Sequence, residues 1–332
     1  MRPMAGTKDP AKAMHAAVAR AGKQALEVEV EGRRLQLTNL DKVMYPKTGF
    51  TKRELIDYYV RISPWLLPHL AGRPLSLKRY PNGVEAPFFY QKECPAHRPE
   101  WLPTTNWYSE TRGADIEFCM ADSLADLVWL ANAADLELHT YLCTFRDTDR
   151  PTTLAFDLDP GEGAGVLECA EVAEAVRAAL GHLGLECFPK VSGAKGIQVY
   201  APLNTPMTYA QTKPFARRVA EALEAALPEL VTSNMRKALR AHKVLVDWSQ
   251  NDTHKTTVCV YSLRGRPEPS VSVPLSWPEL ERLRRRGDPE GFRFGPDDAV
   301  RRAEKLGDLF APVLTMQQRL SLQPARPGSK AA

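Results

Sequence analysis

The chain has 332 residues, of which 44% are hydrophobic and 25% charged, a composition typical of a globular protein with one or two domains. The sequence has no apolar run long enough to span a membrane and no signal-peptide pattern, so it predicts a soluble, cytoplasmic protein. The net charge of +4 is compatible with a polyanionic partner but does not identify one.

The six cysteines are scattered and form no CxxC pair, which predicts reduced thiols in the cytosol. Cys94 and His97 have the spacing of half a zinc site. A structural zinc ion needs about four ligands, and no second pair follows, so the pattern disfavours zinc.

The first half of the chain predicts an N-terminal module. Residues 1–25 mix Ala, Lys, Gly and Pro without a clear apolar stripe, which predicts a flexible arm. Thr51 with Glu54 forms a capping-box pattern that marks the start of a helix. The predicted elements are a hairpin over 26–37, a helix over 52–67, a strand over 74–80, a helix over 123–134 and a strand over 136–139.

The second half predicts an α/β (α+β) fold of the split β-α-β-β-α-β type. Its elements are strand 153–157, helix 166–183, strands 186–191 and 197–201, helix 209–227 and strand 243–248, then strand 256–263 and helix 277–286. We expect one domain over 26–320, divided into an N-terminal module (26–150), a catalytic module (151–275) and a C-terminal helical part (276–320), with a loose tail over 321–332.

Two acidic residues stand at the end of the strand at 153–157. Side chains alternate along a strand, so Asp157 and Asp159 share a face opposite Phe156 and Leu158. In a split βαβ unit this strand lies between the third and fourth strands, and both helices cover the other face of the sheet. Strand phase therefore brings Asp247 to the same open face. Three carboxylates in this arrangement predict a site for two divalent cations.

The turn at 192–196 reads Ser-Gly-Ala-Lys-Gly and lies at the same edge of the predicted sheet. Ser192, the glycine amides and Lys195 offer a hydroxyl, unobstructed N–H groups and an ammonium, which suit a triphosphate. The turn lacks the Walker A spacing. The glycines at 161, 163 and 165 do not match a dinucleotide-binding pattern, and we interpret them as a flexible strand-to-helix turn.

Four motifs together resemble one protein family. They are FDLDPG at 156–161, SGAKG at 192–196, VDWSQN at 246–251 and YSLRGR at 261–266. The stretch from about 37 to 275 is similar to the polymerase domain of bacterial DNA ligase D, of the archaeo-eukaryotic primase superfamily. The resemblance implies a primase-like fold, with an RRM-like catalytic module packed on an N-terminal α/β module.

The resemblance also implies roles for individual residues. Asp157, Asp159 and Asp247 would bind two Mn²⁺ or Mg²⁺ ions and carry catalysis. The incoming nucleotide would contact Lys78, His139, Ser192, Lys195, Gln198, Gln250 and Arg264. Lys42 and Lys52 would hold a DNA 5′-phosphate, as a lysine pair suits a doubly charged terminal phosphate. Phe88 and Phe89 match an aromatic pair that stacks on the template, and we expect one of them to stack and the other to fill the core.

The chain departs from the family pattern at Gln198. The family usually carries a histidine there that faces the nucleotide phosphates, whereas a glutamine can donate a hydrogen bond but cannot carry charge. The sequence contains no KxDG ligase motif, so we expect a stand-alone polymerase.

The resemblance predicts a template-dependent nucleotidyltransferase that extends primers and fills short gaps in DNA repair or end joining. Expected partners are gapped DNA with a 5′-phosphate, NTPs or dNTPs with ribonucleotides preferred, and, beyond these, Ku and a separate ligase; we expect a monomer. Two alternatives are a phosphatase of the haloacid dehalogenase type, which also begins with a DxD strand, and a non-catalytic DNA-end binder.

Overall fold

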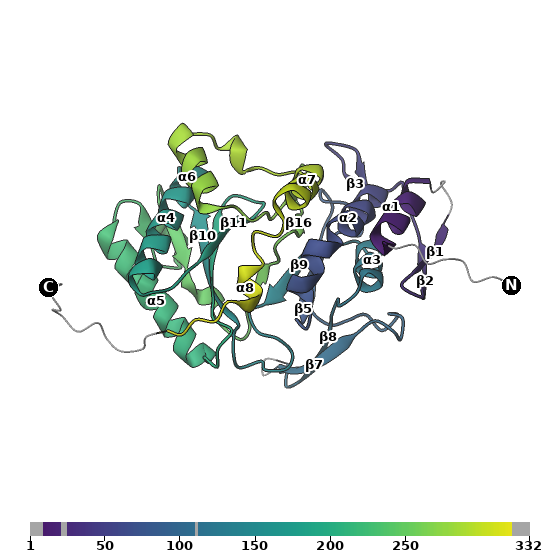
Figure 1. Cartoon of the computed structure of the whole chain (residues 1–332), viewed down its shortest axis with the longest axis horizontal. Coiled ribbons are helices and arrows are strands. Elements are labelled where there is room, and N and C mark those ends of the chain that lie inside the picture. The colour runs from purple at the N-terminus through teal and green to yellow at the C-terminus, as the bar shows by residue number, and fades with distance from the viewer. Residues whose placement is uncertain (1–8, 21–24, 110–111, 321–332) are drawn as a thin grey trace.

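The computed structural model describes residues 9–20, 25–109 and 112–320. The molecule is elongated, with one sheet in each half and the C-terminal helices lying between and beside them (Figure 1). The predicted tail over 321–332 lies outside the described residues. Among the helices of the described ranges, none is both long and apolar enough to cross a membrane.

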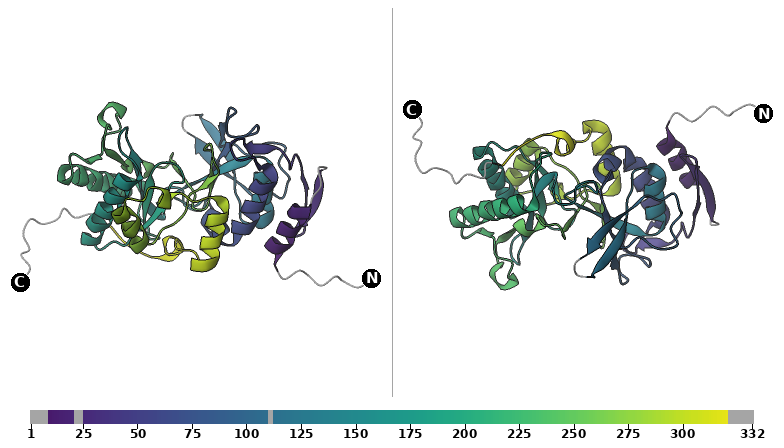
Figure 2. Two further views of the ribbon diagram at one scale, coloured as in Figure 1. Left: turned by 90° about the horizontal axis from the view of Figure 1, so that it is seen from above. Right: turned by 90° about the horizontal axis from the view of Figure 1, so that it is seen from below.

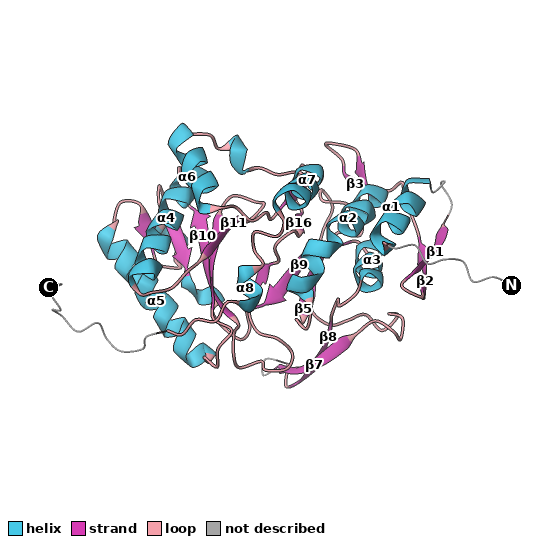
Figure 3. Cartoon of the chain, viewed as in Figure 1, coloured by secondary structure: helices cyan, strands magenta, loops and turns pink. Residues whose placement is uncertain are grey.

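The five-stranded sheet confirms the predicted split topology. Its strand order is β11-β12-β10-β14-β13, so that β10 (Thr153–Pro160) lies between β12 (Ile197–Pro202) and β14 (Val244–Asp247). Helices α4 (Val166–His182) and α5 (Tyr209–Ala226) both pack on β10 from one side of the sheet (Figure 3). Strand β11 (Phe188–Val191) forms one edge, and the short β13 (Val231–Thr232), which the sequence analysis missed, forms the other.

The second sheet mixes both halves of the chain. Its order is β15-β9-β5-β6, with β5 (Leu75–Arg79), β6 (Phe89–Gln91) and β9 (Asp135–Tyr141) from the first half and β15 (Thr256–Val258) from the second. The predicted continuous strand over 256–263 is therefore wrong: β15 ends at Val258, and the chain turns before β16 (Leu263–Arg264) pairs with β17 (Ser270–Val271). Tyr261, at φ 64°, lies in this turn.

The first-half helices pack beside the second sheet. Helix α2 (Lys52–Leu70) begins at the predicted capping box, where Thr51 and Glu54 exchange hydrogen bonds, and α3 (Leu124–Asn132) is capped by Ser123. The predicted hairpin forms as β1 (Leu26–Val30) and β2 (Arg33–Leu37) at the far end of the molecule (Figure 2). Two further pairs are β3 (Val43–Tyr45) with β4 (Phe50–Thr51), and β7 (Thr104–Ser109) with β8 (Ala114–Cys119).

The predicted flexible arm is wrong for Pro10–Arg20, which form helix α1. Met14 and Val18 are one turn apart and both buried, and the helix packs on α2. Arg53 of α2 donates to the Val18 carbonyl, and Asp57 pairs with His15. Two apolar residues are too few to give a clear stripe in the sequence, but they suffice once α2 supplies the surface they cover. Residues 1–8 and 21–24 lie outside the described ranges.

The C-terminal helices connect the two halves. Helix α6 (Trp277–Arg286), predicted correctly, packs on α4, while α7 (Pro296–Leu306) packs on α2. Arg61 of α2 donates to Asp297 at 2.7 Å, and His69 bonds Asp308 at 2.7 Å. The short α8 (Pro312–Thr315) lies against β12.

The prediction of six reduced cysteines is wrong for one pair. Cys94 and Cys119 form a disulfide, with their Cα atoms 4.9 Å apart. The Cys94 amide donates to the carbonyl of Glu117, which places the 94 loop beside the end of β8. The hairpin of β7 and β8, which ends at Cys119, was not predicted. The spacing of the cysteines alone therefore did not indicate that these two thiols meet. His97 packs on Trp129 rather than completing a zinc site with Cys94.

Candidate active site

A row of four residues crosses the five-stranded sheet. Asp157 on β10 is in register with Asp247 on β14 and with Gln198 on β12, and Gln198 is in register with Lys190 on β11. Residues directly opposite each other on neighbouring strands point to the same face. This acid row therefore runs from Lys190 through the Gln198 amide to the carboxylates of Asp157 and Asp247. Asp159, two residues further along β10, is counted with it.

The three acids repel one another. Burial, followed by the negative charges of Asp159 and Asp247, raises the pKa of Asp157 to about 7. Burial and Asp247 also raise the pKa of Asp159. Asp247 is held by its own neighbours, because its carboxylate accepts from the Ser249 amide at 2.8 Å and from the Gln250 side chain at 2.9 Å. A divalent cation would relieve this repulsion.

The turn at 192–196 lies against the end of β10, as predicted. Its hydroxyl braces it: Ser192 Oγ accepts from the amides of Ala194 and Gly196, both at 3.2 Å. A Cβ on Gly196 would lie 2.1 Å from the Leu158 carbonyl, so only glycine permits this approach. The exposed Lys195 thus lies on the turn that touches the strand carrying Asp157 and Asp159.

A buried carboxylate, Glu137 on β9, collects three of the predicted nucleotide contacts. It is 2% exposed and accepts from Lys78 Nζ at 3.2 Å and Arg264 Nε at 3.1 Å, and it bonds His139 Nε2 at 3.0 Å. Tyr80 and the Gly265 amide add further donors, both at 2.9 Å. Although burial opposes the charge, hydrogen bonds and cations around Glu137 hold its pKa well below the ordinary value.

Arg264 joins this cluster to the turn. Besides Glu137, its guanidinium donates to the Ser192 carbonyl at 2.6 Å. The two halves of the predicted nucleotide site, one on each sheet, are therefore connected through one side chain from β16.

Three consecutive aromatic residues lie on or next to β6. Phe88, Phe89 and Tyr90 are 47%, 46% and 58% exposed. The expectation that one of the two phenylalanines fills the core is therefore wrong. The edge of the four-stranded sheet leaves them outside, where Lys78 lies 4.0 Å from the Phe88 ring centroid and Arg79 5.5 Å from that of Phe89.

The two predicted 5′-phosphate lysines lie near the start of α2. Lys42 Nζ donates to Asn82 at 2.9 Å, and Lys52 Nζ donates to the Thr38 carbonyl at 2.8 Å. Burial and then the charge of Lys42 lower the pKa of Lys52 to about 8. The structure thus places them close enough to repel each other, an arrangement that a bound anion would stabilise.

Comparison with known proteins identifies the family. The family model described as "LigD, primase-polymerase domain" matches residues 51–310. The chain belongs to the LigD primase-polymerase family. It is 42% identical to the multifunctional non-homologous end joining protein LigD of Mycolicibacterium smegmatis over 282 residues, covering 84% of this chain and 36% of that protein. The Bacillus subtilis bifunctional LigD is 34% identical over 249 residues, covering 75% and 40%.

A solved structure gives the same family. The polymerase domain from Mycobacterium tuberculosis ligase D in complex with DNA matches with a TM-score of 0.79 and 41% identity, covering 86% of this chain and 99% of that one. The fold is therefore archaeo-eukaryotic primase-like, and homologous primase-polymerase domains are nucleotidyltransferases. The chain spans about a third of the length of the mycobacterial relatives. The largely antiparallel sheet is not the doubly wound sheet that a haloacid dehalogenase phosphatase requires.

The acids of this primase-polymerase chain suit a divalent cation by chemistry. Carboxylate oxygens are the ligands that Mg²⁺ and Mn²⁺ prefer. Within the described ranges, no group of three or more His, Cys, Asp or Glu side chains is already converged on a metal position.

Sequence reasoning missed several residues of the site. Glu137 and Lys190 gave no signal, because a single buried charge is recognised only from its partners. Arg240 lies in a basic loop. Burial and the charge of Asp247 raise the pKa of Asp159, and the positive charge of Arg240 partly offsets this rise. A Cβ on Gly161 would lie 1.7 Å from the Arg240 carbonyl, so the predicted flexible glycine turn is a close packing contact instead.

Two buried atoms in this region have no hydrogen-bond partner in the described part of the chain. They are Arg240 Nε and Gln250 Oε1. Unsatisfied buried polar atoms are uncommon and call for an explanation, of which a bound ion, water or ligand is one. Both belong to residues that act on the acid row, since the Gln250 side chain donates to Asp247 and the charge of Arg240 lowers the pKa of Asp159.

Proposed function

We propose that the chain catalyses template-directed nucleotidyl transfer to a 3′-hydroxyl and fills short gaps during DNA repair or end joining. The observation that carries the proposal is the convergence of the acid row, the 192–196 turn and the Glu137 cluster at one edge between the two sheets. The chemistry requires carboxylates that hold metal ions and basic side chains that bind a triphosphate. Both kinds of side chain lie at this edge.

In this proposal Asp157, Asp159 and Asp247 would hold two Mn²⁺ or Mg²⁺ ions. Such ions supply activation of the attacking hydroxyl and neutralisation of the leaving pyrophosphate. Lys195, the turn amides and Arg264 bind the triphosphate. Gln250 fixes Asp247 with one side-chain atom and keeps its unpartnered Oε1 for a ligand.

The Glu137 cluster serves the rest of the nucleotide. Lys78 and His139 are held on one carboxylate and face the side of the site that carries the exposed aromatics. Burial lowers the pKa of His139, which favours the neutral imidazole and suits contact with a sugar hydroxyl better than with a phosphate. We propose a preference for ribonucleotides at this position.

The DNA would contact the start of α2 and the exposed aromatics next to the Glu137 cluster. Lys42 and Lys52 bind the 5′-phosphate across a gap, and Phe88 and Phe89 give a template base a stacking surface, worth about 1–3 kcal/mol per base. The similar M. tuberculosis polymerase domain was solved in complex with DNA, which supports DNA as the partner. We expect the end-joining partners, Ku and a separate ligase, from the family resemblance alone.

The test is primer extension on a gapped duplex, with and without a 5′-phosphate, comparing ribonucleotides and deoxyribonucleotides with Mn²⁺ or Mg²⁺. We expect metal-dependent incorporation that the 5′-phosphate stimulates and that Asp247→Ala abolishes. Unchanged extension by Asp247→Ala would sink the mechanism. DNA binding without incorporation by the wild type would favour the non-catalytic end binder.

A further inference from the structure

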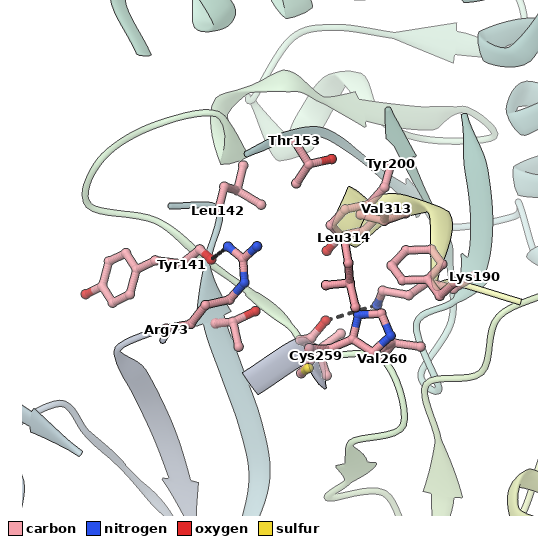
Figure 4. A pocket seen from close by; sticks show the side chains of 14 residues that line it. Arg73, Tyr141, Leu142, Thr153, Lys190, Tyr200, Cys259, Val260, Val313 and Leu314 are labelled. Atoms are coloured by element: carbon pink, nitrogen blue, oxygen red, sulfur yellow. Dashed lines mark hydrogen bonds between the residues drawn. The ribbon is translucent and has the colours of Figure 1, made fainter. Parts of the chain in front are cut away.

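Lys190 is a buried lysine at the end of the acid row, and the proposed mechanism does not use it. It is 1% exposed and lies on β11, at the interface between the two sheets. Figure 4 shows its ammonium and the Arg73 guanidinium on the walls of a cavity of about 40 Å³. Burying an ammonium is costly unless its hydrogen bonds are met, so its surroundings indicate what it does.

The Lys190 ammonium donates to three acceptors, none of which is a carboxylate. They are the Gln198 side-chain oxygen, the Val258 carbonyl at 3.0 Å and Ser272 Oγ at 2.8 Å. Ser272 uses its own proton on the Val191 carbonyl at 2.9 Å, so it can only accept from Lys190. Burial lowers the pKa of Lys190 to about 7, and the protonated form is the one whose three donors match these three acceptors.

This arrangement fixes the direction of the Gln198 amide. A lysine ammonium has donors only, so the atom of Gln198 that faces it must be the oxygen. The amide nitrogen is then directed to the other side, toward Asp157, its register partner on β10. Gln198 lowers the pKa of that carboxyl, against the burial and the neighbouring acids that raise it. A flipped amide would oppose its oxygen to the Asp157 carboxylate, which is repulsive.

We propose that Lys190 is a positioning residue for nucleotidyl transfer: through the Gln198 amide it holds the Asp157 carboxylate in the orientation that binds the divalent cation. The inference rests on the proposed function for its role in catalysis. The geometric part, from Lys190 through Gln198 to Asp157, can be measured on the protein without nucleotide or DNA.

The change in Mn²⁺ affinity on replacing Lys190 distinguishes a positioning role, a through-space charge effect and a purely structural role. We would measure the Mn²⁺ dissociation constant of the nucleotide-free full chain by electron paramagnetic resonance, for the wild type and Lys190→Met. A positioning role predicts several-fold weaker Mn²⁺ binding. A mere through-space charge predicts tighter binding, since removing a positive charge favours a cation, and a purely structural role predicts no change. Either of the last two results would overturn the proposal.

The matched control is Ser272→Ala. It removes another hydrogen bond of the same ammonium without touching Gln198, so we expect a lower melting temperature but unchanged Mn²⁺ affinity. Gln198→Met carries the test if Lys190→Met does not fold, because it removes the amide opposite Asp157 directly; unchanged Mn²⁺ affinity in this variant would also overturn the proposal.

A double-mutant cycle tests whether Lys190 acts through Gln198. We expect roughly tenfold lower turnover with little change in nucleotide KM for each single variant, and no further loss in Lys190→Met/Gln198→Met. Additive losses would contradict the positioning role. Lack of incorporation by the wild type would reject the proposed function, whereas the Mn²⁺ comparison would still decide the inference.

Discussion

At the residue scale, a single carboxylate organises much of the site. Glu137 is the common partner of Lys78, His139 and Arg264, which come from three different strands. Each of these side chains is long or rotatable and would lose its fixed position without that partner. The Glu137 carboxylate therefore fixes the positions of all three side chains.

We expect Glu137→Gln to lower stability by about 3 kcal/mol and to raise the nucleotide KM at least tenfold, because removing one partner leaves buried cations uncompensated. Chemical denaturation and steady-state kinetics measure the two effects. Glu174→Gln is the control, since it weakens the partly exposed pair with Arg284, where water screens the charges, and should cost about 1 kcal/mol. Equal effects of the two variants would contradict the role given to Glu137.

Asp135 predicts a pH dependence of stability. It is 1% exposed, its Oδ1 has no hydrogen-bond partner in the described ranges, and Arg79 Nε lies 3.4 Å away. Burial outweighs Arg79 and raises the pKa of Asp135 to about 7, above its unfolded value. The folded state therefore binds the extra proton, and the stability this gives is present at low pH and lost as pH rises through 7.

The Asp135→Asn variant isolates this effect. Between pH 5 and 8 we expect the wild type to lose about 3 kcal/mol relative to the variant, because the loss runs over the two units up to the pKa of Asp135 and each unit corresponds to about 1.4 kcal/mol. Urea unfolding of both proteins across this range is the measurement. A difference that stays constant with pH would show that Asp135 titrates normally.

At the element scale, the 192–196 turn works because it can touch β10. Gly196 is the contact point, and any side chain there must push the turn off the Leu158 carbonyl. Strand phase alone predicted that turn and acids share an edge. The distance between the turn and the acids depends on how closely the backbone at Gly196 approaches the Leu158 carbonyl. The pattern of hydrophobic residues contains no information about that approach.

Gly196→Ala should therefore reduce nucleotide incorporation at least tenfold by displacing Lys195 from the acids. Gly181→Ala is the matched control, because it lies within α4 with nothing within 4 Å of its added Cβ. It should retain activity and gain up to about 1 kcal/mol of stability. Incorporation and melting temperature, measured side by side, decide; full activity in Gly196→Ala would refute the argument.

At the scale of the whole molecule, the two halves are joined by elements that cross between them. Strand β15 completes the sheet of the first half, α7 from the C-terminal part packs on α2, and the Tyr58 hydroxyl donates to the Tyr261 carbonyl at 2.6 Å. Such shared burial makes it difficult for one half to unfold while the other stays intact.

We expect one cooperative unfolding transition for the full chain, with coincident midpoints by far-ultraviolet circular dichroism and tryptophan fluorescence. Arg61→Ala, which removes the contact between α2 and Asp297 of α7, should lower the midpoint without splitting the transition. Two separated transitions in the wild type would show that the halves are independent domains.

The sequence by itself determined the local elements and the acid face. Alternating hydrophobicity and capping boxes located most helices and strands, since those signals depend on neighbours along the chain, and the strand phase brought Asp247 to Asp157. It could not indicate α1, the Cys94–Cys119 pair or the division of 256–263 into two strands.

Only the tertiary structure decided how the site is held. Glu137 is held by Lys78 and Arg264, which are 59 and 127 residues away, and Lys190 donates to Val258, 68 residues away on the other sheet; hydrophobic patterns along the chain give no measure of such approaches. Burial converts these ordinary charged residues into fixed ones, because a charge removed from water must keep its hydrogen-bond partners. That is the physical reason why the acids were visible in the sequence and their supports were not.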